Sequence, residues 1–286
     1  MRFSASRLKT WGDCQLQGSF KYLDNLPSLT HAKSAFGSVI HAALETYDRT
    51  GDLEVAKDRF RDLWQNPEKI GVTIDFWPKH GRITHGGLRQ KGLEVLQAYH
   101  DRWHFDSKRE LVALEHPFLV PFGRHELTGF VDKLEIRKTA KAKTILAVVD
   151  HKSNARKPTV AELALNIQFT IYIFASMQPE FWVGNGPEFP GIPNGEWLFD
   201  TSKDLPRRAI WHHLMTGQEI DAGGRDNEEF ARLYRLCNEV QRAIELKVFV
   251  PSISGETCGI CSYANGPCPT RVPTQQELLE DADAWL

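Results

Sequence analysis

The sequence predicts an α/β fold with a helical front, a sheet core and a cysteine-rich end. Through most of the first third of the chain, apolar residues follow the spacing of amphipathic helices. The middle contains three β-rich segments separated by short polar breaks, which is typical of an antiparallel meander. Helical spacing then returns, so the order of the segments indicates one α/β core.

The first third contains four stretches with helical spacing. The clearest covers residues 34–48, where Ile40, Leu44 and Tyr47 recur every three or four residues. A stretch rich in helix breakers, from Trp77 to Gly87, predicts a loop. The predicted helices cover residues 3–10, 34–48, 52–65 and 86–105.

The meander is predicted at residues 111–121, 125–137 and 144–150, where β-branched and other apolar residues are frequent. Two more strands are expected at Glu196–Asp200 and Arg208–Leu214. The other elements expected after the meander are a helix over residues 160–177, a Pro/Gly-rich loop over 178–194 and a long charged helix over 226–247.

The length of 286 residues suits one large domain or two modest ones, and we expect a single domain over 1–286. Its parts would be a mostly helical front at 1–106 with Cys14 and His41, a sheet core at 107–215 and a long helix with the cysteine segment at 216–286.

Composition excludes some classes of protein. The hydrophobic share of 41% is ordinary for a soluble globular protein, and we find no run of 18 apolar residues and no apolar signal region, so we expect a cytoplasmic protein without a membrane partner. A net charge of −2 means that any nucleic-acid site must gather its basic residues locally. No G-x-x-x-x-G-K-[ST] loop is present, so we expect neither a nucleotide cofactor nor helicase activity.

Two strand ends carry the chemistry. Gly129-Phe-Val-Asp132 and Ala147-Val-Val-Asp150-His-Lys152 each place an acid at the end of an apolar run, and Asp150 and Lys152 point the same way by strand alternation. Two carboxylates can hold a hard divalent ion, and a neighbouring cation can stabilise developing negative charge. The alternative is an Asp that caps a turn beside a solvated lysine.

Two helices add candidates. His41 and Glu45 lie four residues apart on the helix over residues 34–48, and a neutral imidazole is a good ligand for manganese. Gln168 and Tyr172 repeat this spacing on the helix that follows the meander. The alternative interpretation is a structural histidine, a surface glutamine and a buried tyrosine.

Together these residues resemble the PD-(D/E)XK nuclease superfamily, and within it the RecB-like branch with iron–sulfur exonucleases associated with CRISPR systems. The resemblance implies a restriction-endonuclease-like core, in which a central mixed sheet is flanked by helices. It also implies that Mg²⁺ or Mn²⁺ is held by the acids and the helix histidine, and that the main-chain carbonyl of His151 joins the metal shell. The site residues carried over are His41, Asp132 and Asp150 as metal ligands, with Asp132, Asp150, Lys152, Gln168 and Tyr172 as the catalytic set.

The cysteines suggest a second site. Five cysteines do not suit a disulfide framework, whereas Cys258-Gly-Ile-Cys261, Cys268 and the distant Cys14 could form a four-thiolate site for zinc or a [4Fe–4S] cluster. One cysteine upstream and three downstream resemble the iron–sulfur nucleases of the RecB-like branch, which implies [4Fe–4S], with Zn²⁺ as the alternative occupant. We expect Cys237 to be a packed core thiol.

The resemblance implies an exonuclease that hydrolyses single-stranded or end-exposed DNA. The alternative function is a DNA-binding or processing subunit of a CRISPR-acquisition or recombination complex with weak activity of its own. A zinc-stapled structural protein with incidental acids is a third hypothesis. The candidate DNA contacts are Lys133, Arg156, Lys157 and Trp77, although a charged hairpin is often only a solvated turn.

Overall fold

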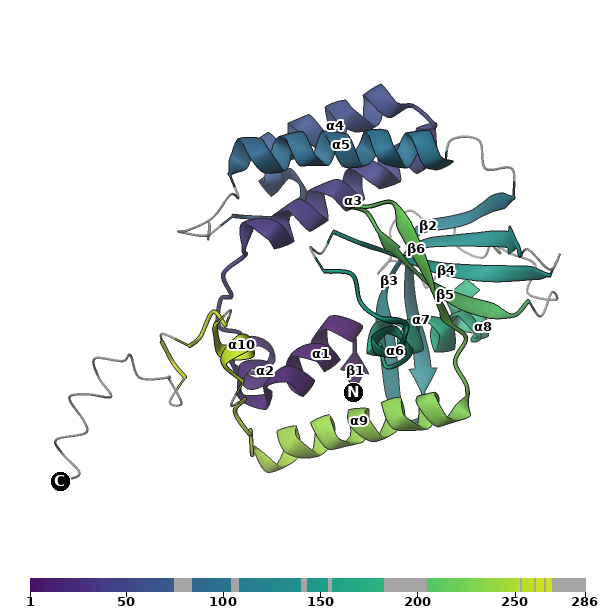
Figure 1. Cartoon of the computed structure of the whole chain (residues 1–286). Coiled ribbons are helices and arrows are strands. Elements are labelled where there is room, and N and C mark those ends of the chain that lie inside the picture. The colour runs from purple at the N-terminus through teal and green to yellow at the C-terminus, as the bar shows by residue number, and fades with distance from the viewer. Residues whose placement is uncertain are drawn as a thin grey trace. The chain divides into compact units, whose positions relative to one another are not determined.

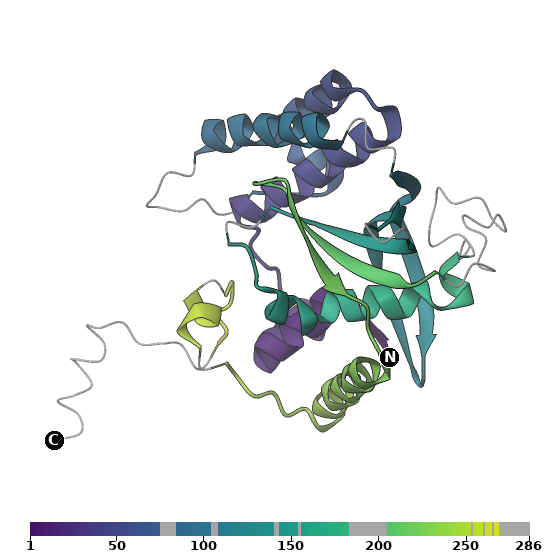
Figure 2. The same cartoon turned by 45° about the vertical axis from the view of Figure 1, so that its right-hand side comes forward.

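The computed structural model describes nine stretches of the chain, and their helices and strands are drawn in Figures 1 and 2. The chain divides into two compact units. Unit 1 consists of Met1–Ala5 and Thr30–Arg235, and unit 2 consists of Ser6–Leu29 and Leu236–Leu286. The described residues are 1–74, 84–103, 108–139, 143–153, 156–182, 205–252, 254–259, 261–264 and 266–268.

Unit 1 is built on a mixed six-stranded sheet, as predicted. Along the main path the strands follow the order β1-β3-β4-β5-β6. β2 lies off this path and pairs with β3. β1 runs parallel to β3, β4 runs parallel to β5, and the remaining pairs are antiparallel. The strands are β1 (Arg2–Phe3), β2 (Arg109–Phe122), β3 (His125–Lys138), β4 (Thr144–Lys152), β5 (Arg207–His213) and β6 (Gln218–Gly223).

The meander of β2, β3 and β4 confirms the three predicted strands and their antiparallel pairing. β5 matches the strand predicted at Arg208–Leu214, whereas β6 was not predicted. The strand predicted at Glu196–Asp200 lies outside the described residues.

The turn between β2 and β3 fixes the register of the hairpin. Gly123 has a φ of +59°, a left-handed conformation that glycine adopts without strain, and Phe122 pairs directly with His125. The position of Gly123 is also crowded, because an added Cβ would lie 2.6 Å from the Tyr234 ring. The hairpin therefore depends on glycine for both conformation and space.

Three helices of unit 1 pack together: α3 (Ala32–Thr50), α4 (Leu53–Gln65) and α5 (His85–Trp103). They confirm the helices predicted at residues 34–48, 52–65 and 86–105. Asp52 accepts the backbone N–H groups of Glu54 and Val55 and so starts α4 one residue after the left-handed Gly51 ends α3. A short 3₁₀ helix, η1 (Pro67–Ile70), follows α4.

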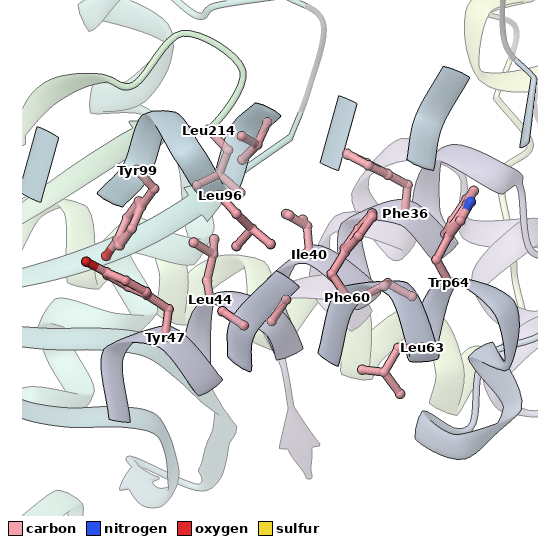
Figure 3. Close-up of a cluster of buried hydrophobic side chains, with 14 residues drawn as sticks. Phe36, Ile40, Leu44, Tyr47, Phe60, Leu63, Trp64, Leu96, Tyr99 and Leu214 are labelled. Carbon is pink, nitrogen blue, oxygen red and sulfur yellow. The ribbon is translucent and has the colours of Figure 1, made fainter. Parts of the chain in front are cut away.

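Their shared core is apolar and combines aromatic with aliphatic side chains. Figure 3 shows Phe36, Ile40 and Leu44 of α3 facing Phe60 of α4 and Leu96 of α5, and all five are at most 3% exposed. Burial of side chains of this size contributes about 1.5–3 kcal/mol each. This packing anchors α3, and α3 carries His41.

The helix predicted over residues 160–177 is two helices, α6 (Val160–Ala164) and α7 (Ile167–Ser176). The break occurs at Leu165 and Asn166, because the Asn166 side chain accepts the N–H of Phe169 and starts a new helix. A third short helix, α8 (Pro179–Trp182), lies within the loop predicted at residues 178–194, of which residues 183–194 lie outside the described residues.

Unit 2 joins the first helices to the last part of the chain. Trp11 packs on Phe249 with ring centroids 5.6 Å apart, and Tyr263 Oη donates to the carbonyl of Leu26 at 3.0 Å. Its helices are α1 (Ala5–Asp13), α2 (Gln15–Tyr22), the part of α9 (Asn227–Leu246) from Leu236 onward, and α10 (Gly255–Gly259). In the described parts of the chain, no helix is long and apolar enough to cross a membrane.

Candidate active site

The two predicted acids meet where the ladder between β3 and β4 ends. The last residues paired at this end are Lys133 and Val149, and the next position on each strand is Asp132 and Asp150. The backbone N–H of His151 donates to Asp132 Oδ2 at 2.7 Å. A side-chain carboxylate thus satisfies a backbone amide of β4 at this point and fixes the orientation of Asp132.

Asp150 is held by neighbours from β4 and α7. Lys152 Nζ lies 2.9 Å from both carboxylate oxygens of Asp150, and Gln168 Nε2 donates to Asp150 Oδ1 at 2.9 Å. Gln168 Nε2 also donates to Tyr172 Oη at 2.7 Å. The N-cap at Asn166 positions α7, so the structure brings the four predicted residues together.

His41 reaches the site from α3. Its Nδ1 lies 3.5 Å from Asp132 Oδ2. Burial lowers the pKa of His41 to about 4, so the imidazole is neutral near pH 7 and can act as a ligand. Glu45, one turn along, pairs with Arg49 Nη2 at 2.7 Å, and its charge adds to the raised pKa of Glu115.

Glu115 was not predicted, yet it faces Asp132 from β2. Ligand atoms of His41, Glu115 and Asp132 all lie within 4.8 Å of one another. Its backbone has a φ of +44°, a strained conformation for a residue other than glycine, of the kind found at functional sites. The hairpin register could have revealed Glu115. Glu115 lies seven residues before Phe122 and Asp132 lies seven residues after His125, so the Phe122–His125 pair places the two acids opposite each other.

We call Glu115, Asp132 and Asp150 the carboxylate cluster. Burial raises the pKa of Asp132 and of Asp150 to about 6 and that of Glu115 to about 8, and in Glu115 the nearby Asp132 adds to this effect. Lys152 opposes the shift in the two aspartates. When all three carboxylates are ionised, one ammonium balances only one of them, and two negative charges remain. A single divalent cation would balance them, and oxygen donors with one imidazole suit Mg²⁺ or Mn²⁺.

A second group of buried charges, next to the site, is balanced. Lys133 Nζ lies 3.0 Å from Asp48 Oδ1, 2.8 Å from Glu135 Oε1 and 3.0 Å from Tyr99 Oη. Glu219 binds two arginines through both of its oxygens, at 2.9–3.0 Å. The members of this buried ion network are Asp48, Arg109, Lys133, Glu135, Arg137 and Glu219.

The four candidate DNA contacts have different positions. Lys133 is 8% exposed, and its three partners use the three donors of an ammonium group, so here it faces the interior. Arg156 and Lys157 are exposed, and they contact Glu162 and Gln218 respectively. Trp77 lies outside the described residues.

The side chain of His151 lies within a row of aromatic groups. His151 Nδ1 is 3.0 Å from Nδ1 of His212, and its ring lies edge-on to His41 and Tyr99. Burial holds the pKa of His151 well below its ordinary value, so the imidazole is neutral. The backbone amide of His151 therefore contacts the site, while its side chain packs in the interior.

The cysteines lie in unit 2. Cys14 Sγ accepts the N–H of Ser252 at 3.2 Å, and the Cys258 thiol donates to the carbonyl of the same serine at 3.7 Å. Burial raises the pKa of Cys261, and the nearby Cys14 and Cys268 raise it further. All four predicted ligands therefore gather in one region.

Cys237 differs from these four. It is 0% exposed, on the part of α9 that belongs to unit 2, and burial raises its pKa to about 12. A fully buried thiol that stays protonated near pH 7 fits the packed core residue that the sequence predicts.

A buried carboxylate cluster with a lysine at a broken strand pair of a mixed sheet has the donor groups that can hold a divalent cation. The sequence matches the model of the PD-(D/E)XK nuclease superfamily over residues 2–266, and the chain belongs to this superfamily. The predicted superfamily is thereby confirmed.

Two other comparisons add little. A solved structure described as "Crystal structure of SSO0001" is similar at 12% identity and a TM-score of 0.33, over 83% of this chain and 86% of that one. A likeness at this level supports no conclusion about the site. No curated protein matches the sequence.

Proposed function

We propose that the protein is a Mg²⁺- or Mn²⁺-dependent deoxyribonuclease that hydrolyses phosphodiester bonds in DNA. The observation that carries the proposal is the carboxylate cluster, whose two unbalanced charges equal the charge of one divalent cation. The ion would be held by His41, Glu115, Asp132 and Asp150. When bound, such an ion lowers the pKa of a water ligand and offsets charge on the phosphate.

The residues around the ion have distinct tasks. The amide of His151 orients Asp132, and Lys152 with Gln168 orients Asp150. Burial alone would lower the pKa of Lys152, but the Asp150 and Asp132 carboxylates outweigh it, and the pKa is raised. Lys152 therefore stays cationic and serves to stabilise negative charge that develops on the phosphate.

The preferred reaction is exonucleolytic cleavage of single-stranded or end-exposed DNA. Support for this choice comes from the resemblance to RecB-like exonucleases, while the superfamily match over residues 2–266 supports a nuclease in general. Exposed Arg156 and Lys157 would add salt-dependent phosphate contacts that do not depend on base sequence.

The test uses the full chain, purified without oxygen and given Mn²⁺ or Mg²⁺ with end-labelled single- and double-stranded DNA. Wild type should release short products from ends and leave a circular single strand intact. Asp150→Ala should abolish cleavage, whereas Asp58→Ala, which removes a 75% exposed carboxylate on α4, should cut at the wild-type rate. Cleavage by Asp150→Ala at the wild-type rate would contradict the proposal, and cutting of the circle would overturn exonuclease action.

We further propose that Cys14, Cys258, Cys261 and Cys268 hold a structural [4Fe–4S] cluster in unit 2. Support comes from the hydrogen bonds of Cys14 and Cys258 with Ser252 and from the electrostatic interaction of Cys261 with Cys14 and Cys268. Four thiolates suit such a cluster, and its binding would stabilise the fold of the unit.

Anaerobic protein should be brown and contain about four iron and four sulfide per chain, the content of one [4Fe–4S] cluster. Cys268→Ala should lose iron, whereas Cys237→Ala, which removes the buried fifth thiol, should keep it. Stoichiometric zinc without iron would refute the cluster and leave a zinc staple.

A further inference from the structure

Phe130 is an exposed aromatic residue beside the carboxylate cluster. It is 56% exposed, and within the described stretches of the chain it is the one Phe, Trp or Tyr residue in the exposed class. The other large apolar residues in that class are aliphatic or methionine. A single exposed apolar side chain is ordinary, but this ring lies close to charged groups of the site.

The ring lies one strand repeat from the site. Phe130 and Asp132 are two residues apart on β3, so their side chains leave the strand on the same side, about 6.6 Å apart along it. On β2, Pro117 pairs with Phe130, and Glu115 lies opposite Asp132. Phe130 and Pro117 therefore form an apolar cross-strand pair next to the acidic pair of Glu115 and Asp132.

The alternation of β3 shows that the outward position of Phe130 follows from the fold. On its two sides, Val131 is 0% exposed, and Gly129 has so little room that an added Cβ would lie 3.0 Å from the Phe118 ring and 3.8 Å from Tyr172.

We infer that Phe130 is a stacking platform for the base of the nucleotide next to the phosphate held at the carboxylate cluster. Every base has a π-face, so a phenyl ring would stack on any of them and give affinity without sequence preference. A base must be unpaired and unstacked from its duplex to reach the ring, so the inference specifies single-stranded DNA as the substrate. It rests on the proposed nuclease function and deepens it.

The first test is binding to a short single strand by the full chain, with Ca²⁺ replacing the catalytic ion. Phe130→Ala and Phe130→Leu should each weaken binding roughly tenfold, the cost typical of one lost stacking contact, while Phe130→Trp should retain it. The leucine variant keeps apolar bulk but has no π-face. Leu111→Ala, which truncates a 45% exposed side chain on β2, is the matched control and should bind like wild type.

The second test locates the stacked base. A set of oligonucleotides carries one abasic residue at successive positions, and one position should weaken wild-type binding as much as Phe130→Ala does. At that position the substitution and the abasic residue should not add, because both remove the same contact. A 2-aminopurine placed there should be quenched by wild type and not by Phe130→Ala.

The outcomes separate this inference from the function on which it rests. If wild type cuts DNA but Phe130→Ala binds every strand as tightly as wild type, the stacking role is wrong and the nuclease proposal stands. If Phe130→Ala weakened binding equally on the intact strand and on every abasic strand, the stacking role would also be wrong. If wild type neither binds nor cuts DNA, both proposals fail.

Discussion

The buried ion network and the carboxylate cluster lie next to each other. They differ in charge balance and in the direction in which most of their carboxyl pKa values are shifted. The network has three acids and three bases, and within it the pKa of Glu219 is lowered to about 2 and that of Glu135 is also lowered. Asp48 is the exception, because burial raises its pKa. In the carboxylate cluster all three pKa values are raised.

The difference shows which cluster is complete by itself. Charges that are all paired and hydrogen-bonded gain nothing from a further ion, whereas carboxylates that outnumber their cations are destabilised until one binds. The same sheet thus carries one group of charges that stabilises the protein and another that awaits a ligand.

The largest effect is expected for Asp132→Asn, which removes one charge and leaves an oxygen to accept the amide of His151. Cleavage should fall on the order of a thousandfold. The metal-free protein should melt at a higher temperature at pH 8, because an unbalanced buried charge is gone. Activity and thermal melting would be measured on one preparation, with Asp58→Asn as the control. A lower melting temperature would show that the cluster is not under electrostatic strain.

Breaking the network should have the opposite consequence for stability. Glu219→Ala leaves Arg109 and Arg137 without their shared partner, and the free energy of unfolding should fall by about 3 kcal/mol or more. Asp221→Ala breaks an exposed pair with Arg208 and should cost under about 1 kcal/mol. Urea denaturation compares the two, and equal costs would contradict the distinction between a buried network and a surface pair.

The third prediction concerns pH. Folding raises the pKa values of these acids, so ionising them destabilises the metal-free protein. Their contribution to the free energy of unfolding is complete below about pH 4, the ordinary carboxyl range, and is lost as pH rises through 6 and 8. Mn²⁺ should therefore stabilise the protein more at pH 8 than at pH 5, because protons compete less for the carboxylates at the higher pH. At one hundred times the Kd the gain is about 2.7 kcal/mol.

Thermal melts with and without Mn²⁺ at pH 5 and pH 8 would measure this difference. Asp132→Asn serves as the control and should respond weakly at both values. An equal shift at both pH values in wild type would show that the ion binds elsewhere.

The smallest effect is expected for Gln168→Leu, which removes the donor shared by Asp150 and Tyr172. Groups that orient a metal ligand typically contribute ten- to a hundredfold, and we expect about tenfold in the cleavage rate. The loss should diminish at high Mn²⁺ if Gln168 acts by orienting Asp150. A loss that no Mn²⁺ concentration reduces would indicate a direct contact with DNA instead.

Much of the site follows from local pattern. Strand alternation alone predicts that Asp150 and Lys152 lie together, and their atoms are 2.9 Å apart. Helical spacing predicts that Gln168 and Tyr172 are neighbours, and they share a hydrogen bond. These relationships involve two to four residues, so the sequence contains all that is needed.

The features that were missed depend on distant partners or on weak patterns. Glu115 becomes part of the site only through the hairpin register, and Lys133 is buried where Asp48, 85 residues earlier, lies beside Glu135 as a second counter-charge. β6 has only two buried or half-buried apolar residues, Ile220 and Ala222. Two such residues are too few to predict a strand from apolar alternation. A local pattern cannot show which distant segment completes an environment.

The composition of unit 2 from the first and last segments has a consequence for synthesis. The bond between Cys14 Sγ and the N–H of Ser252 spans 238 residues. At about 5–20 residues per second, the ribosome needs roughly 12 to 50 s to make the second partner after the first. During that interval Ser6–Leu29 has emerged without the segment it packs on, while unit 1 can already fold. Cys14 therefore lacks its hydrogen-bond partner Ser252 throughout that interval.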